Sequence, residues 1–171
     1  MSRAVLSIGS NVGDRLARLR SVVDALAGHL VAVSPVYETP PWGPVAQDDY
    51  LNAVVVVDDP GADARAWLER AHALERAAGR EHAVRWGPRT LDVDIVQVVD
   101  GDAVRSSDPD LTLPHPRAHE RAFVLVPWAD VDPEAVLAGQ GRVADLAATL
   151  PAGERAGVRR RDDLTLAAVW P

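Results

Sequence analysis

Two carboxylates, Asp92 and Asp94, stand on either side of Val93 in a stretch that is otherwise apolar. Side chains two positions apart on a β-strand project from the same face, so both carboxylates face one way while their apolar neighbours pack on the other side. Oxygen donors about 6.5 to 7 Å apart at the backbone can share two magnesium ions about 3.5 to 4 Å apart, the separation that serves in-line displacement at phosphorus. Taken alone, such a pair is more often a solvated face, so its neighbours decide the interpretation.

Three arginines precede the acidic pair within one loop: Arg80, Arg85 and Arg89. Their charge of +3 balances the -3 of Glu81 and the acidic pair, and two divalent cations bring the local sum to about +4, which attracts a triphosphate. The alternative is a set of surface salt bridges. The rigid aromatic turn at 86–88 (Trp-Gly-Pro) argues against that alternative and favours a phosphate site.

A second chemical signal comes from Tyr50 and Asn52, which share one strand face beside a proline-rich loop. The amide of Asn52 offers a donor and an acceptor, a pairing that suits the edge of a pyrimidinone ring. The alternative for Tyr50 and for Phe123 is ordinary core. His115 lies between two prolines and by itself is more typical of a turn, while His72 and His119 receive no functional assignment.

The composition is that of a globular protein. The 171 residues fit one domain, with 47% hydrophobic and 25% charged residues. No apolar run reaches the ~18 to 20 residues of a membrane span, and the N-terminus lacks the apolar core and cleavage site of a signal peptide. The absence of cysteine excludes disulfides, thiolate metal sites and cysteine nucleophiles. We therefore expect a cytoplasmic monomer that has no membrane partner.

The charged residues exclude further function classes. None of the 18 basic residues is lysine, which rules out Schiff-base chemistry and a P-loop lysine, so phosphate must meet arginine, backbone amides or metal. The net charge of -7 disfavours a broad nucleic-acid surface, because such a surface needs an excess of positive charge. The basic run at 159–161 is followed at once by two aspartates, which neutralise it.

The elements that must position these groups alternate along the chain. Period and turn signals predict strands at 4–8, 31–37, 50–57 and 90–99, helices at 16–30, 64–78 and 143–150, and stiff loops at 9–14, 38–49 and 80–89. Gly79 is a plausible helix C-cap. Two successive β-α-β patterns predict an α/β (α+β) sandwich with a largely antiparallel sheet flanked by helices. We expect a single domain over residues 1–171, with a loosely ordered tail at 160–171.

The segment at 85–95, RWGPRTLDVDI, closely resembles the signature of the 6-hydroxymethyl-7,8-dihydropterin pyrophosphokinase family of folate biosynthesis. Further segments resemble that family in order and spacing: 8–11, 38–44, 49–52, 113–116, Arg121 and Phe123. Together they span residues 4 to about 130, and the likeness beyond them is general. The resemblance implies a ferredoxin-like fold and a transfer of the diphosphate of ATP to the hydroxymethyl group of the dihydropterin, by attack at the β-phosphorus with release of AMP.

The resemblance also implies residue roles. Asp92 and Asp94 would hold two magnesium ions and, with Arg80, Arg89 and Arg121, form the catalytic group. The nucleotide would contact Glu75, Arg80, Trp86, Arg89, Ile95, Leu111, Thr112, His115 and Arg121. The pterin would contact Thr39, Pro40, Trp42, Tyr50, Asn52 and Phe123. Catalysis on this scheme is mostly positioning and electrostatics, with no obvious general base.

The chain departs from the family pattern at two positions. His82 stands where many members have a second arginine, and Asp110 stands where some have a basic residue; Arg85 is available to compensate. We expect weaker ATP affinity rather than lost activity. Two other functions remain open at this point: another two-metal phosphoryl or nucleotidyl transferase, and a non-catalytic pterin-binding module, against which the intact acidic pair argues.

Overall fold

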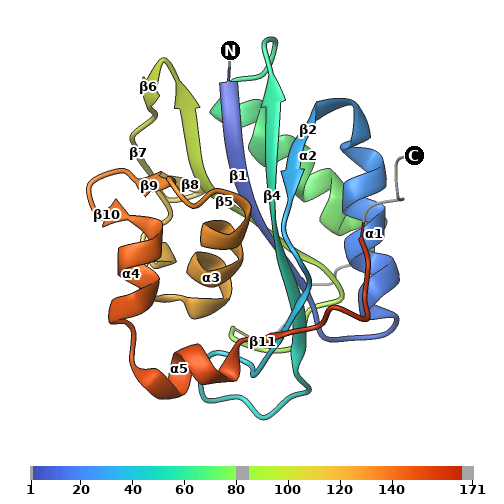
Figure 1. Cartoon of the computed structure of the whole chain (residues 1–171). Coiled ribbons are helices and arrows are strands. Elements are labelled where there is room, and N and C mark those ends of the chain that lie inside the picture. The colour runs from blue at the N-terminus through green and yellow to red at the C-terminus, as the bar shows by residue number, and fades with distance from the viewer. Residues whose placement is uncertain (1, 80–84, 167–171) are drawn as a thin grey trace.

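An antiparallel sheet of seven strands forms the centre of the computed structural model, which describes residues 2–79 and 85–166 (Figure 1). The strand order is β11-β3-β4-β1-β5-β6, and β2 pairs with β4 beside that path. The strands are β1 (Ser2–Ser10), β2 (Leu30–Val33), β3 (Tyr37–Thr39), β4 (Tyr50–Asp59), β5 (Asp92–Asp100), β6 (Asp102–Ala103) and β11 (Arg159–Arg160).

Helices cover both faces of the sheet (Figure 1). One face carries α1 (Arg15–Ala25) and α2 (Ala64–Ala77), and the other carries α3 (Ala122–Val131) and α4 (Val143–Thr149). The smaller elements are η1 (Ala27–His29), β7 (Ser106–Asp108), β8 (Leu111–Leu113), η2 (Ala118–Glu120), β9 (Val136–Leu137), β10 (Gly141–Arg142) and α5 (Ala152–Gly157). The run β1-α1-β2/β3-β4-α2-β5, with β1 between β4 and β5, is the ferredoxin-like arrangement, so the predicted fold class is confirmed.

The central strands are buried on both faces, which explains their nearly continuous apolar sequences. Ile8, Val55 and Val93 pack with Leu19 and Trp67 on the α1/α2 side. Val54 and Val96 pack with Leu125 and Trp128 on the α3 side. The two cores hold β1, β4 and β5 rigidly, and these are the strands that carry the polar residues described below.

A β-bulge at Val96 follows the acidic pair of β5. Val5 of β1 pairs with Gln97 and Leu6 pairs with Ile95, so Val96 has no partner in this register. The freed carbonyl of Val96 accepts a hydrogen bond from the backbone N–H of His115 at 2.8 Å. The segment before α3 is thereby fastened to β5.

Several elements differ from the sequence prediction. The strand expected at 31–37 is split, because Ser34 exchanges hydrogen bonds with Val54 and Pro35 has no N–H to donate. Helix α3, at Ala122–Val131, was not among the predicted helices. The expected loosely ordered tail does not hold for residues 160–166, since β11 pairs with β3 and Leu166 is buried. Gly79 has φ +74° and caps the C-terminal end of α2, as predicted. In residues 2–79 and 85–166, none of the helices has the length and apolar character of a membrane span.

Candidate active site

A cavity of about 310 Å³ lies on the α3 side of the sheet, where β1 ends and β4 and β5 begin. Its walls come from β3, β4 and β5, the loops at 40–49 and 85–89, and the segment leading into α3. Residues expected from the sequence to form a site line it together: Thr39, Pro40, Trp42, Tyr50, Asn52, Trp86, Arg89, Asp92, Asp94, His115, Arg121 and Phe123. Residues that the sequence assigned to metal, phosphate and ring recognition therefore share one cavity.

The acidic pair forms one side of the cavity. Asp92 and Asp94 both line it, while Val93 and Ile95 are buried in the opposite core, as the alternation of a strand requires. Arg121 Nη1 lies 3.4 Å from Asp94 Oδ2. Arg121 Nε is buried and finds no hydrogen-bond partner among the residues that the structure describes. A cation with spare donor capacity thus stands beside the carboxylates.

Two small residues of β1 lie between the β4 and β5 residues that line the cavity. Gly9 pairs with Asn52 on one side and with Asp92 on the other, and Ser7 pairs with Val54 and Asp94. With neighbouring strands about 4.8 Å apart, the backbones of Asn52 and Asp92 are separated by about 10 Å across Gly9. A Cβ on Gly9 would lie 2.5 Å from Asn52 Oδ1. The glycine therefore allows the amide of Asn52 to lie flat over β1.

The amide wall of the cavity consists of Thr39, Tyr50 and Asn52. Asn52 Nδ2 donates to Thr39 Oγ1 at 2.5 Å, and the asparagine is only 4% exposed. Tyr50 Oη donates to the carbonyl oxygen of Gly87 at 3.3 Å. This wall places a fixed amide and an aromatic ring opposite the acidic pair.

The loops at 40–49 and 85–89 are tied to each other and to β1. Asn11 donates to Gln47 Oε1 at 2.8 Å and to the carbonyl oxygen of Asp48 at 2.9 Å, while its own Oδ1 accepts from the N–H of Arg89 at 2.8 Å. Gln47 Nε2 donates to the carbonyl oxygen of Trp86 at 2.6 Å. Trp86 has φ +64°, a left-handed conformation that costs energy for a bulky residue and is held here by these contacts.

Aromatic rings and arginines close the remaining side. The rings of Trp42 and Trp86 are 5.2 Å apart between centroids. The guanidinium of Arg117 lies 5.5 Å and 4.7 Å from their centroids, and that of Arg121 lies 5.1 Å from Trp42 and 5.5 Å from Phe123. Cation–π contacts of this kind hold the charges inside the cavity mouth. The sequence analysis did not single out Arg117; its place two residues after His115 was the available signal.

His115 is neutral in this setting. Burial lowers the pKa of the His115 imidazole to about 4, and the positive charge of Arg121 acts in the same direction against the opposing effect of Asp92. Its Nδ1 accepts from the N–H of Arg117 at 3.1 Å, so the proton of the neutral ring resides on Nε2. The ring therefore offers the cavity a hydrogen-bond donor without a charge.

Some residues assigned to the nucleotide do not line the cavity. Ile95 and Leu111 are buried in the core of the α1/α2 side, and Glu75 is buried on α2. Thr112 Oγ1 donates to the carbonyl oxygen of Asp108 at 3.0 Å. Arg80 and His82 lie outside the described residues, and Asp110 is exposed. Arg85 does line the cavity, and its guanidinium lies 5.3 Å from the centroid of the Trp86 ring. The cavity thus has an acidic side, an amide side and an aromatic side.

Solved structures share the fold of this chain. The Plasmodium falciparum structure titled HPPK-DHPS wild type superposes with a TM-score of 0.61 at 15% identity, covering 86% of this chain and 44% of that one. A structure titled HPPK-DHPS in complex with substrates gives a TM-score of 0.64 at 12% identity, covering 86% of this chain and 43% of that one. At such identities the likeness concerns the fold alone, and this chain spans less than half of either structure's length.

Sequence relatives are closer. The protein named 2-amino-4-hydroxy-6-hydroxymethyldihydropteridine pyrophosphokinase of Mycobacterium tuberculosis is 52% identical over 168 residues, covering 93% of this chain and 89% of the relative. The protein of the same name from Methylorubrum extorquens is 41% identical over 157 residues, covering 90% of this chain and 97% of the relative. Residues 5–133 match the family described as 7,8-dihydro-6-hydroxymethylpterin-pyrophosphokinase (HPPK). With its acidic pair and amide wall facing each other across one cavity, this chain belongs to the 7,8-dihydro-6-hydroxymethylpterin-pyrophosphokinase family.

Proposed function

We propose that this chain transfers the diphosphate of ATP to the hydroxymethyl group of 6-hydroxymethyl-7,8-dihydropterin, by in-line attack at the β-phosphorus and with release of AMP. As a family member the chain is an ATP-dependent pyrophosphokinase of folate biosynthesis. The observation that carries the finer proposal is the opposition of Asn52 and Asp92 across Gly9 in one cavity. A ring held by the amide wall directs its substituent toward the acidic pair.

The acidic pair suits magnesium better than a softer metal. Asp92 and Asp94 supply carboxylate oxygens, and among the described residues no group of three or more histidine, cysteine or acidic side chains forms a closed cage. Magnesium is commonly held by one or two carboxylates, with phosphate oxygens and water completing its octahedron. We propose that these two aspartates hold two magnesium ions together with the triphosphate. Bound there, the ions supply charge neutralisation at the phosphates and a lowered pKa at the attacking hydroxyl.

The chain's own residues supply positioning and fixed charge. Arg121 has a buried Nε with spare donor capacity and stands 3.4 Å from Asp94, a place from which it can donate to phosphate oxygens that approach the acidic pair. His115 offers a neutral Nε2 donor. Donors that are already in place when charge develops in the transition state lower the barrier without reorganisation. Arg89 lines the same cavity, and we assign it to the triphosphate with these two residues.

Recognition of the pterin belongs to the amide wall. Asn52 is held by Thr39, so its carbonyl oxygen and remaining amide proton have fixed directions toward the ring edge. Tyr50, Phe123 and Trp42 supply flat apolar surfaces around the ring. A buried amide that is left without its partner groups disfavours analogues that lack them, so we expect strong discrimination against rings without the amino-oxo edge.

A labelling assay tests the proposal. Purified protein is incubated with magnesium, 6-hydroxymethyl-7,8-dihydropterin and ATP labelled at the β-phosphorus, and products are separated. We expect AMP release that requires the pterin, and label in the pterin diphosphate. Label in free pyrophosphate with AMP attached to the pterin would instead identify a nucleotidyl transferase, and binding without turnover would identify a pterin-binding module. Asp94→Asn should abolish transfer, whereas Asp102→Asn, an exposed aspartate in the β5–β6 hairpin, should not.

A further inference from the structure

The C-terminal segment, residues 152–166, runs along the edge of the sheet beside the amide wall (Figure 1). Its strand β11 extends the sheet by pairing Arg159 with Glu38 and Arg160 with Tyr37 of β3. The N–H of Arg161 donates to the carbonyl oxygen of Val36 at 2.8 Å. Strand β3 has only three residues and would otherwise be an exposed edge, so it depends on this segment for half of its backbone pairing.

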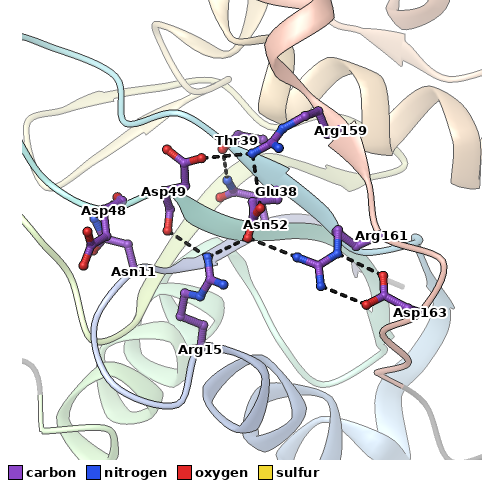
Figure 2. Close-up of polar contacts among 10 residues, drawn as sticks. All are labelled: Asn11, Arg15, Glu38, Thr39, Asp48, Asp49, Asn52, Arg159, Arg161 and Asp163. Carbon is purple, nitrogen blue, oxygen red and sulfur yellow. Dashed lines mark hydrogen bonds and ion pairs between the residues drawn. The ribbon is translucent and has the colours of Figure 1, made fainter.

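Glu38 collects three arginines on the face of β3 that points away from the cavity (Figure 2). Arg15 of α1 donates to its Oε2 at 2.9 Å, Arg161 donates to the same oxygen at 3.2 Å, and Arg159 donates to Oε1 at 3.2 Å. The Glu38 side chain is 16% exposed. The bonds from Arg15 and Arg161 are partly buried, which makes them stronger than ordinary surface pairs, whereas Arg159 is 57% exposed.

The same arginines also hold the far end of the proline loop (Figure 2). Arg159 donates to Asp49 Oδ2 at 3.0 Å, and Arg15 donates to the carbonyl oxygen of Asp49 at 3.1 Å. Asp49 directly precedes Tyr50. The network therefore fixes both ends of the loop that separates Thr39 from Tyr50, two residues of the amide wall.

The end of α5 touches the cavity wall directly. A Cβ on Gly157 would lie 3.3 Å from both Cγ and Cδ of Pro40, which lines the cavity. A side chain at this position would push the proline toward the cavity. Gly153, in the same helix, has no atom within 4 Å of such a Cβ.

From these contacts we infer that the C-terminal segment is a positioning element for pterin binding: Glu38 with its three arginines, and Gly157 against Pro40, set the placement of the amide wall. The inference rests on the proposed assignment of the pterin to that wall. Glu38 and Gly157 are positioning residues, because neither lines the cavity. Changes at these residues should raise the KM for pterin and leave the KM for ATP and the saturated kcat nearly unchanged, since the acidic pair lies on the other side of β1.

The first test compares two leucine substitutions in one helix. Gly157→Leu should raise the KM for pterin at least fivefold, with kcat and the KM for ATP within twofold of wild type. Gly153→Leu, the matched control, should leave all three constants unchanged. Its urea midpoint should be similar to that of Gly157→Leu. Equal constants for the two variants would overturn the inference.

The second test removes the charge that gathers the arginines. Glu38→Gln should raise the KM for pterin about tenfold, because three arginines lose the shared negative charge and one of the two acceptor oxygens. Glu38→Asp should recover part of the loss. Glu134→Gln, at an exposed ion pair with Arg142, is the control. Calorimetric titration with the pterin and a non-hydrolysable ATP analogue distinguishes a failure of the proposed function from a failure of this inference. Failure of the wild type to bind pterin overturns the proposed function and this inference together. Wild-type binding with equal affinity in Glu38→Gln and Gly157→Leu overturns this inference alone.

Discussion

Replacement of Gly9 by alanine is the sharpest test of the amide wall. A methyl group at this position would lie 2.5 Å from Asn52 Oδ1, whereas ordinary contact begins at 3.4 Å, so the amide must retreat by about 0.9 Å. Its bond to Thr39 is 2.5 Å long and Asn52 is 4% exposed, so a retreat of this size breaks the bond without giving water ready access. The same methyl group would lie 3.3 Å from Tyr50 Cδ1, so the substitution is a small change that acts on Asn52 first and on Tyr50 second, both in the amide wall.

The expected magnitude follows from that geometry. A buried polar group that loses its hydrogen bond costs about 1 to 3 kcal/mol. Since about 1.4 kcal/mol is a factor of ten in an equilibrium constant, the KM for pterin should rise roughly 5-fold to 150-fold. Glycine to alanine in a permitted backbone conformation stabilises the folded chain by about 0.4 to 1 kcal/mol through the unfolded state, which offsets part of the clash in a stability measurement.

The assay is steady-state release of AMP with each substrate varied in turn, beside urea unfolding of the same preparations. Gly28→Ala is the control, because a Cβ there meets no atom within 4 Å. We expect Gly9→Ala to raise the KM for pterin, with the KM for ATP within about threefold of wild type. If the pterin KM of Gly9→Ala equals that of Gly28→Ala, Asn52 does not bind the ring in the manner proposed.

Three further outcomes are expected. Asp94→Ala should lower kcat at saturating magnesium by at least a hundredfold, because a lost ligand removes several kcal/mol of charge stabilisation; turnover within tenfold of wild type would contradict the metal assignment. Arg117→Gln should raise the KM for ATP about tenfold and change the fluorescence of the tryptophans that it contacts, and an unchanged ATP constant would remove Arg117 from the site. Asp59→Asn, far from the cavity, should lower the urea midpoint at pH 7 and leave both KM values unchanged. Bonds from Arg70 and the N–H of Gly61 lower the pKa of the Asp59 carboxyl, so its stabilising effect is present above about pH 3.8 and is lost as the pH falls through the lowered pKa. A difference in urea midpoint between wild type and variant that failed to shrink as the pH fell below 3.8 would contradict this cause.

The local features of this protein could be predicted from the sequence because they depend on period and on single residue types. The alternation of residues 91–95 was sufficient to put Asp92 and Asp94 on one face, and the structure has both lining the cavity. The left-handed C-cap at Gly79 and the irregular loop at 40–49 follow in the same way from glycine and proline chemistry. The family resemblance rested on such local segments, read in order along the chain.

Other features depend on which strands become neighbours and in what register. The opposition of Asn52 and Asp92 exists only because β1 lies between β4 and β5 and carries Gly9 at the crossing point. The bulge at Val96, which fastens His115 to β5, also arises from strand pairing. No local pattern specifies these partners, since pairing is decided by the packing of both sheet faces together.

The sequence by itself therefore determined the chemical groups, their facing within each strand and the fold class. Only the tertiary structure decided that the guanidinium of Arg117 contacts two tryptophan rings, and that an arginine-rich segment near the C-terminus pairs with β3 beside the amide wall. Side-chain periodicity is a property of the local backbone, whereas these contacts join residues whose proximity is created by folding.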